Sequence, residues 1–209
     1  MTRPPTETPR FDPFPGCAAV VIGGSAGGSA VLRRILRGLP RVYPLPIIVV
    51  QHLHPDDDGM LAGNLDNAMA LPVVEALDKM PVQPGHIHVA PADYHLLVER
   101  GRTLALSVDE PVRFSRPSID LCFQSAAIAF GPALLAILLT GANDDGTDGL
   151  RTVRNRGGRT VAQDPATAPF LFMPQAAIDA GAAQWVLTPD QIAATLARLG
   201  KEAAHGSPA

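Results

Sequence analysis

The sequence contains few cysteines and no long basic run. Only two of its 209 residues are cysteines, Cys17 and Cys122, and both lie in apolar stretches. This excludes a disulfide-rich secreted scaffold and predicts two buried free thiols in a reducing compartment. Lys and Arg never occur in runs of more than two residues, and the formal net charge is -3. The chain therefore lacks the basic surface typical of nucleic-acid-binding proteins, and we expect no nucleic-acid partner.

Long hydrophobic runs are also missing. The longest apolar stretch, residues 126–139, is interrupted by Gly131-Pro132, and it is shorter than the roughly 20 residues that a membrane-spanning helix needs. Residues 1–15 are rich in proline and polar residues and have no apolar core. They predict a disordered tail and not a signal peptide. We therefore expect a cytoplasmic protein that does not insert into a membrane.

The remaining chain predicts one globular domain, because 46% of the residues are hydrophobic and 18% are charged. We expect this domain over residues 16–199, followed by a frayed tail at residues 200–209. Apolar runs of strand length alternate in it with segments of helical periodicity. Strands are expected at residues 18–22, 47–51, 73–75, 133–139, 159–162 and 185–187, and helices at residues 29–37, 59–70, 119–130, 146–155, 174–180 and 189–199.

Residues 87–90, 95–99 and 103–107 alternate with turn residues and indicate an antiparallel hairpin insert around Gly101. The alternation of strands and helices elsewhere predicts an α/β fold. We expect a doubly wound, mostly parallel sheet flanked by helices, with the small antiparallel hairpin added to it.

A glycine-bracketed serine follows the first predicted strand. Gly23-Gly24-Ser25-Ala26-Gly27 fits the pattern G-x-S-x-G, and a helical segment begins just after it. Such a turn exposes a serine hydroxyl at the edge of a sheet beside a helix N-terminus, which suits a nucleophile. A phosphate-binding turn and a simple helix cap are the alternatives, and this stretch alone does not decide among the three.

Two further predicted strands end in reactive side chains. His52 follows residues 47–51, and Asp144 and Asp145 follow the strand that ends at Leu139. Functional groups collect at the carboxyl ends of the strands in doubly wound sheets. A serine, a histidine and an aspartate at one edge are the inventory of a hydrolytic triad. Their order along the chain differs from that of the α/β-hydrolases, in which the aspartate precedes the histidine.

Several of these residues also have other interpretations. His52 and His54, like His86 and His88, have a His-x-His spacing that raises the question of a metal site, but zinc-binding patterns are missing. The segment Asn143–Asp148 faintly resembles a calcium loop without its final glutamate. Residues 56–58, three consecutive aspartates, are most simply a solvated loop and a helix N-cap.

Six spaced motifs together resemble the catalytic domain of the chemotaxis protein-glutamate methylesterases, the CheB family. They run in the family's order over nearly the whole predicted domain. The motifs are Ile22-Gly-Gly-Ser-Ala-Gly-Gly28, Gln51-His-Leu-His-Pro55, Pro84-Gly-His-Ile-His-Val-Ala-Pro91, Ser115-Arg-Pro-Ser-Ile-Asp120, Leu139-Thr-Gly-Ala-Asn-Asp-Asp-Gly146 and Met173-Pro-Gln-Ala-Ala177.

The resemblance implies a serine hydrolase that demethylates glutamate γ-methyl esters on the cytoplasmic domain of chemoreceptors and also deamidates receptor glutamine. It implies Ser25 as nucleophile, His52 as base and Asp145 as the orienting carboxylate. We expect no cofactor and no metal. With these roles, His52 Nε2 is expected within hydrogen-bond reach of Ser25 Oγ, with Asp145 behind it.

The sequence departs from the family's pattern in two ways. Ala26 and Ala142 stand where members often carry threonine and methionine, which changes the shape of the pocket. Residues 1–15 are too short for the receiver domain that many members carry, so the resemblance is to a stand-alone form. An esterase of other substrates and a catalytically degenerate binding module are the alternative functions. Arg113 and Arg116 are candidates for attracting an acidic receptor surface.

Overall fold

The computed structural model describes residues 16–53 and 60–205. The predictions for the tails at residues 1–15 and 206–209, for His54 and for residues 56–58 lie outside these residues. Over the described part of the chain, no helix has the length and apolar character needed to cross a membrane.

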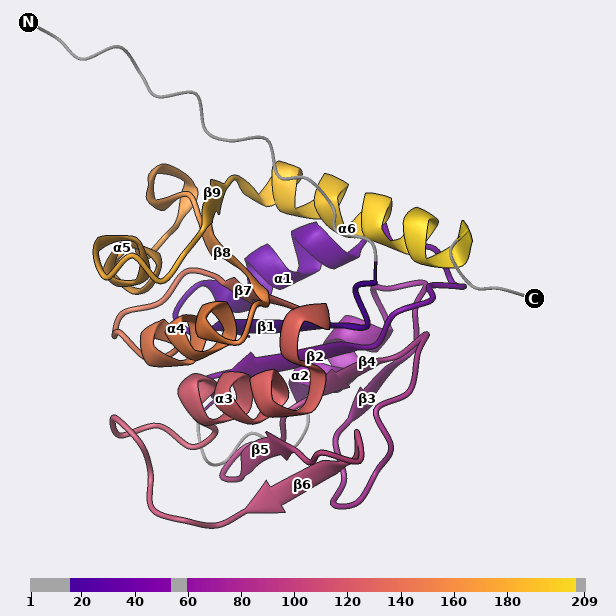
Figure 1. Cartoon of the computed structure of the whole chain (residues 1–209), viewed down its shortest axis with the longest axis horizontal. Coiled ribbons are helices and arrows are strands. Elements are labelled where there is room, and N and C mark those ends of the chain that lie inside the picture. The colour runs from indigo at the N-terminus through magenta and orange to yellow at the C-terminus, as the bar shows by residue number, and fades with distance from the viewer. Residues whose placement is uncertain (1–15, 54–59, 206–209) are drawn as a thin grey trace, which may run out of the picture.

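Seven strands form one parallel sheet in the order β3-β4-β2-β1-β7-β8-β9 (Figure 1). They are β1 (Ala19–Gly24), β2 (Ile47–Gln51), β3 (Val73–Glu75), β4 (Ile87–Val89), β7 (Leu134–Leu138), β8 (Arg159–Gln163) and β9 (Trp185–Leu187). The predicted doubly wound α/β fold is confirmed. Because β2, β1 and β7 are neighbours, the three strand ends with reactive side chains lie side by side.

The antiparallel insert is a separate two-stranded hairpin of β5 (His95–Val98) and β6 (Leu104–Ser107). Its turn contains Gly101, as predicted. Residues 87–89 are not part of it, because β4 joins the main sheet in parallel between β3 and β2.

The helices cover both faces of the sheet. They are α1 (Gly28–Leu36), α2 (Met60–Asp66), α3 (Ile119–Phe130), α4 (Thr147–Asn155), α5 (Phe172–Asp179) and α6 (Pro189–His205), with short 3-10 turns η1 (Gly131–Ala133) and η2 (Pro165–Thr167). Alternate residues of each strand face opposite sides, so the sheet divides the interior into two apolar cores. One core packs under α1, α2 and α6, and the other under α3, α4 and α5.

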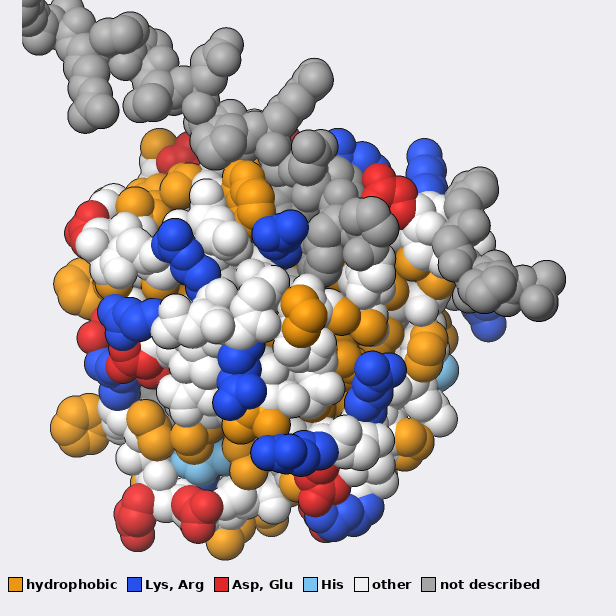
Figure 2. All heavy atoms as spheres, in the orientation of Figure 1, with side chains coloured by type: hydrophobic (Ala, Val, Ile, Leu, Met, Phe, Trp, Pro, Cys, Tyr) orange, Lys and Arg blue, Asp and Glu red, His pale blue; other side chains and the backbone are white. Residues whose placement is uncertain are grey.

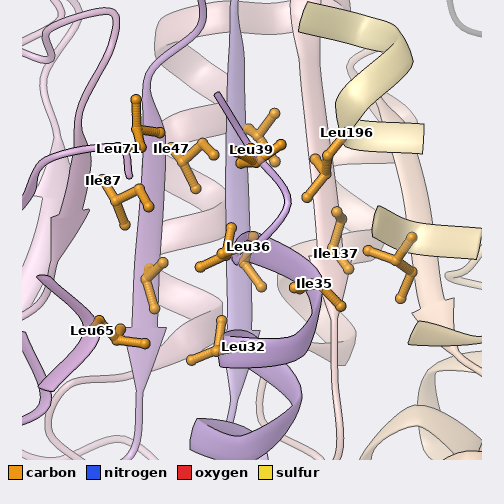
Figure 3. Close-up of a cluster of buried hydrophobic side chains, with 14 of the residues drawn as sticks. Leu32, Ile35, Leu36, Leu39, Ile47, Leu65, Leu71, Ile87, Ile137 and Leu196 are labelled. Atoms are coloured by element: carbon orange, nitrogen blue, oxygen red, sulfur yellow. The ribbon is translucent and has the colours of Figure 1, made fainter. Parts of the chain in front are cut away.

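The first core shows why the central strands are apolar throughout. Leu32, Ile35 and Leu36 of α1 pack on strand side chains such as Ile47 and Ile137 (Figure 3). Each of these side chains is at most 1% exposed, and burying one contributes roughly 1.5–3 kcal/mol. Both cysteines are free thiols, as predicted, but only Cys122 is fully buried and Cys17 is half-buried. Burial raises the pKa of each thiol to about 12.

Two helix ends differ from the prediction by more than two residues. Helix α2 stops at Asp66, whose side chain accepts a hydrogen bond from Val73 N at 2.9 Å and turns the chain into β3. Helix α6 continues to His205, through residues predicted to fray. Gly200 lies against Tyr43, since an added Cβ would come within 2.4 Å of that ring. The Tyr43 hydroxyl donates to Leu196 O at 2.9 Å, so packing on Tyr43 extends the helix.

Figure 2 shows one face of the surface, on which positive, negative and apolar side chains are interspersed. Arg34 of α1 and Asp190 of α6 form one of the exposed ion pairs, at 2.8 Å. Such pairs contribute little to stability, about 0–1 kcal/mol each.

Candidate active site

Ser25 lies in the turn between β1 and α1. Its backbone N–H donates to Thr140 O at 2.9 Å, and its carbonyl accepts from Gly28 N at 2.8 Å. The N-cap of α1 is Gly27, at φ 76°, and it makes no side-chain capping bond. An added Cβ at Gly27 would also meet Pro169 at 3.0 Å, so the turn requires glycine there. Ser25 is therefore not the cap of this helix.

Gln51, the last residue of β2, fixes the backbone of two predicted site residues. Its Nε2 donates to Ser25 O at 2.6 Å and lies 3.3 Å from His52 O. The side chain is almost fully buried, and an added Cβ at Gly28 would come within 2.2 Å of its Oε1. Sequence reasoning missed this role, although Gln51 is a polar residue at the end of an otherwise apolar strand.

The His52 imidazole lies between the other two predicted residues. Its Nδ1 is 3.2 Å from Ser25 Oγ, and its Nε2 is 2.8 Å from Asp145 Oδ2. His52 therefore contacts both Ser25 and Asp145, as expected, but Nδ1 faces Ser25 and Nε2 faces Asp145, whereas Nε2 was expected to face Ser25. Because an ionised carboxylate only accepts, Nε2 carries the ring hydrogen and Nδ1 is left to accept from a hydroxyl.

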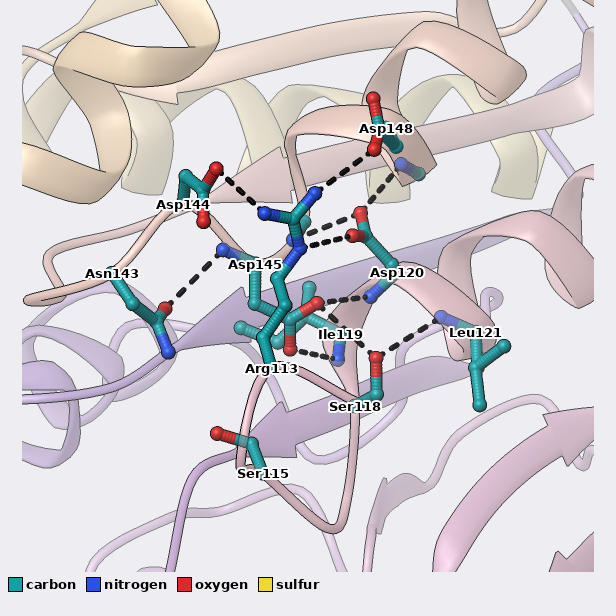
Figure 4. Close-up of polar contacts among 12 residues, drawn as sticks. Arg113, Ser115, Ser118, Ile119, Asp120, Leu121, Asn143, Asp144, Asp145 and Asp148 are labelled. Atoms are coloured by element: carbon teal, nitrogen blue, oxygen red, sulfur yellow. Dashed lines mark hydrogen bonds and ion pairs between the residues drawn. The ribbon is translucent and has the colours of Figure 1, made fainter. Parts of the chain in front are cut away.

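Asp145 is held by the N-terminus of α3 (Figure 4). Its Oδ2 accepts from Ile119 N at 2.7 Å, and its Oδ1 accepts from Ser118 Oγ at 3.1 Å and Asp120 N at 3.0 Å. Burial pushes the pKa of Asp145 up, but the hydrogen bonds from His52, Ile119 and Asp120 outweigh it and lower the pKa below the ordinary value. The carboxylate beside His52 is thus ionised and fixed in orientation.

Asp120 makes the reciprocal contact at the N-terminus of α4. Its Oδ1 accepts from Gly146 N at 2.9 Å and Gly149 N at 2.7 Å. The Asp145 carboxylate, which comes from the loop before α4, thus lies at the N-terminus of α3, and the Asp120 carboxylate of α3 lies at the N-terminus of α4. A negative charge at a helix N-terminus interacts favourably with the helix dipole. Burial is the main cause that raises the pKa of Asp120 to about 6, and the nearby charge of Asp145 adds to it, against the Gly149 hydrogen bond and Arg113.

Asp120 should make the stability pH-dependent. Its pKa in the folded protein, about 6, is above the ordinary 3.8, so the folded protein binds the proton first as the pH falls. The contribution of Asp120 to the free energy of unfolding therefore increases on acidification from about pH 6 to pH 4. Asp120→Asn keeps an oxygen that accepts the two N–H bonds but does not titrate. We expect the difference in unfolding free energy, wild type minus variant, to be larger at pH 5 than at pH 7 in urea titrations. A difference that stays constant or shrinks would contradict the raised pKa.

The two arginines considered for receptor attraction are engaged within the molecule. Arg113 pairs with Asp144 at 2.6 Å, Asp148 at 3.0 Å and Asp120 at 3.4 Å (Figure 4). Arg116 pairs with Asp93 at 2.6 Å and also donates to the carbonyl oxygens of residues 108 and 109. Their role in the structure is to hold the segment between β6 and α3, which loops out at the left of Figure 1.

The alternative metal interpretations find no support among residues 16–53 and 60–205, in which no group of three or more His, Cys, Asp or Glu side chains could hold a metal ion. The His86 and His88 rings stack on each other with centroids 6.1 Å apart. Burial lowers the pKa of His88. In the segment that faintly resembles a calcium loop, Asp144 and Asp148 are both paired with Arg113.

Comparison with known proteins identifies the family. A family model described as CheB methylesterase matches residues 20–196. A Leptospira interrogans protein named as a protein-glutamate methylesterase/protein-glutamine glutaminase is 41% identical over 181 residues, which are 87% of this chain and 94% of the relative. The protein-glutamate methylesterase FrzG of Myxococcus xanthus is 40% identical over 94% of this chain and 59% of its own length.

A solved structure gives the same result. The CheB methylesterase catalytic domain of Thermotoga maritima superposes with a TM-score of 0.83 at 36% identity, over 87% of this chain and 98% of that one. The family model matches most of the chain. The sequence identities to these relatives, 36–41%, are high enough to indicate common descent as well as a common fold. The chain therefore belongs to the CheB methylesterase family.

Proposed function

We propose that this protein is a protein-glutamate methylesterase in which Ser25, His52 and Asp145 act as nucleophile, general base and orienting carboxylate. The observation that carries the proposal is the position of the His52 ring, 3.2 Å from Ser25 Oγ and 2.8 Å from Asp145 Oδ2. Hydrogen-bonded contacts of this kind between nucleophile, base and carboxylate define a triad on any fold. The names of the relatives support the reaction and the substrate class.

In the first half of the proposed reaction, Ser25 Oγ attacks the carbonyl carbon of a glutamate γ-methyl ester. Its proton passes to His52 Nδ1, and the imidazolium that forms is stabilised by the buried Asp145 carboxylate. The proton then passes from Nδ1 to the departing oxygen, and methanol leaves. Ser25 remains as an ester of the substrate glutamate. With glutamine as substrate the leaving group is ammonia.

In the second half, water attacks the glutamyl ester while His52 Nδ1 accepts its proton. The bond between the acyl carbon and Ser25 Oγ breaks, and Ser25 recovers the proton from Nδ1. The negative oxygen formed in each half needs backbone N–H donors. Since Ser25 N already donates to Thr140 O and Gly28 N to Ser25 O, we place these donors at Ala26 and Gly27, which lie between Ser25 and α1.

We propose the cytoplasmic domain of a methylated chemoreceptor as the substrate and the cytoplasm as the place of action. The nucleophile is only partly buried and His52 is 12% exposed, so the site is open enough for a side chain presented by another protein. A small-molecule esterase would use the same chemistry, and the choice between the two rests on the names of the relatives.

The proposed substrate can be tested by comparing two ester classes. We expect the purified protein to release methanol from a methyl-esterified receptor cytoplasmic fragment, with a kcat/KM at least about 100-fold above that for short-chain p-nitrophenyl esters. Methanol release can be followed by gas chromatography. Fast turnover of the short esters without methanol release would indicate an esterase of other substrates. No turnover of either class would indicate a catalytically degenerate module.

A further inference from the structure

A second hydroxyl group lies beside the nitrogen that faces the proposed nucleophile. Ser115 Oγ is 3.4 Å from His52 Nδ1, while Ser25 Oγ is 3.2 Å from the same atom. Nδ1 has a single lone pair, because Nε2 carries the ring hydrogen toward Asp145. One lone pair cannot accept fully from two hydroxyls at once. In the first half of the reaction Nδ1 accepts a proton from Ser25 alone, so this step does not account for a second hydroxyl, that of Ser115, beside the same nitrogen.

The turn that carries Ser115 is held in an unfavourable backbone conformation. Val112 and Ser115 exchange backbone hydrogen bonds at 3.1 and 2.9 Å. The two residues between them, Arg113 and Phe114, have φ angles of 50° and 60°. Turns of this kind favour glycine or asparagine, and a bulky side chain at positive φ is a genuine outlier. Such strain persists where the surroundings enforce it. Here the three ion pairs of Arg113 provide the anchor.

A cavity adjoins His52 on the side of Ser115. It has a volume of about 130 Å³, and its lining includes His52, Phe114, Ser115 and Arg116. One water molecule needs about 10–15 Å³ of such volume together with polar partners. His52 Nδ1 and Ser115 Oγ offer two polar atoms 3.4 Å apart. The space next to them is thus large and polar enough for a water molecule that contacts both.

We propose that Ser115 is a catalytic residue of the second half-reaction, in which its hydroxyl holds the attacking water against His52 Nδ1. This inference rests on the proposed function. In the glutamyl-enzyme, Ser25 Oγ is esterified and no longer donates to Nδ1. Ser115 Oγ then hydrogen-bonds the water, whose proton passes to Nδ1 while its oxygen bonds to the acyl carbon. The acyl–Oγ bond breaks, and Nδ1 returns the proton to Ser25.

The test separates the two half-reactions. With a protein substrate, the glutamyl-enzyme is a covalent adduct of two chains, which is visible as a band of higher mass on a denaturing gel after acid quench. We expect Ser115→Ala to lower methanol release at steady state about tenfold, the effect of one lost hydrogen bond in a transition state. We also expect the adduct to accumulate. The rate at which a fluorophosphonate labels Ser25, which reports the first half alone, should stay within about threefold of wild type.

Two serine variants serve as controls. Ser115→Thr keeps the hydroxyl and should show no accumulated adduct. Ser107→Ala removes a hydroxyl of β6 that accepts from Asp109 N and does not line the cavity beside His52, and it should behave as wild type.

Three results would overturn the role of Ser115: unchanged turnover in Ser115→Ala, an equal loss of labelling and turnover without adduct, or an adduct that accumulates equally in Ser115→Thr. Undiminished methanol release by Ser25→Ala in the same assay would instead overturn the proposed function.

Discussion

Replacing Ser25 by alanine is expected to lower the rate of methanol release by about 10⁶-fold, the loss seen when the nucleophile of a catalytic triad is removed. Alanine leaves no oxygen to form the glutamyl ester. The geometry around the site should persist, because Ser25 is held through its backbone by Thr140, Gly28 and Gln51. The rate of methanol release from a methyl-esterified receptor fragment should be measured for the wild type and the variant, and circular dichroism should verify that the variant is folded.

His52→Ala should cause a loss of similar size, because the base acts only through the nucleophile. The double variant should then be no slower than either single variant, since triad residues act as a unit. Two losses that multiply in the double variant would show that Ser25 and His52 act independently, which is incompatible with the proton transfer at 3.2 Å.

Asp145→Asn is expected to lower turnover by about 10⁴-fold, the effect of this change in another serine hydrolase. An asparagine NH₂ toward His52 would shift the ring hydrogen to Nδ1, which could then no longer accept from Ser25. An NH₂ at the other position would face the donors Ser118 Oγ and Asp120 N. Either orientation leaves buried donors unpaired, and we expect the midpoint of thermal unfolding to fall as well.

Asp144→Asn is the matched control, because Asp144 is the neighbouring residue and its carboxylate faces Arg113 instead of His52. Arg113 retains its pairs with Asp120 and Asp148 in this variant, so turnover should change by no more than about threefold. A larger effect at Asp144 than at Asp145 would show that the orienting carboxylate has been assigned to the wrong residue.

The positions of the predicted residues were accessible from sequence because they depend on short-range signals. Buried strands are recognised by runs such as Ile47–Val50, and a parallel sheet brings the carboxyl ends of its strands to one edge. Ser25 and His52 directly follow β1 and β2, and Asp145 lies in the loop between β7 and α4. The order of the strands, which makes β2, β1 and β7 neighbours, then brings the three side chains together.

The supporting contacts were not accessible, because they join residues far apart in the chain. Asp145 is held by N–H groups about 25 residues away, at the start of α3. The contact of His52 Nε2 with Asp145 joins two residues that are 93 positions apart in the chain. The ion pairs of Arg113 likewise join it to Asp120 and to the more distant Asp144 and Asp148, and its sequence neighbours give no sign of them. Similarly, the packing of Gly200 against Tyr43 carries α6 beyond its predicted end.

The most direct test of the central claim, that Ser25 is the acyl-accepting nucleophile activated by His52, is covalent labelling with a fluorophosphonate followed by peptide mapping. We predict a single modified residue, Ser25, in the wild type, no modification in Ser25→Ala, and labelling that is at least about 100-fold slower in His52→Ala. Modification of another residue, or labelling of Ser25 at an unchanged rate without His52, would contradict the claim.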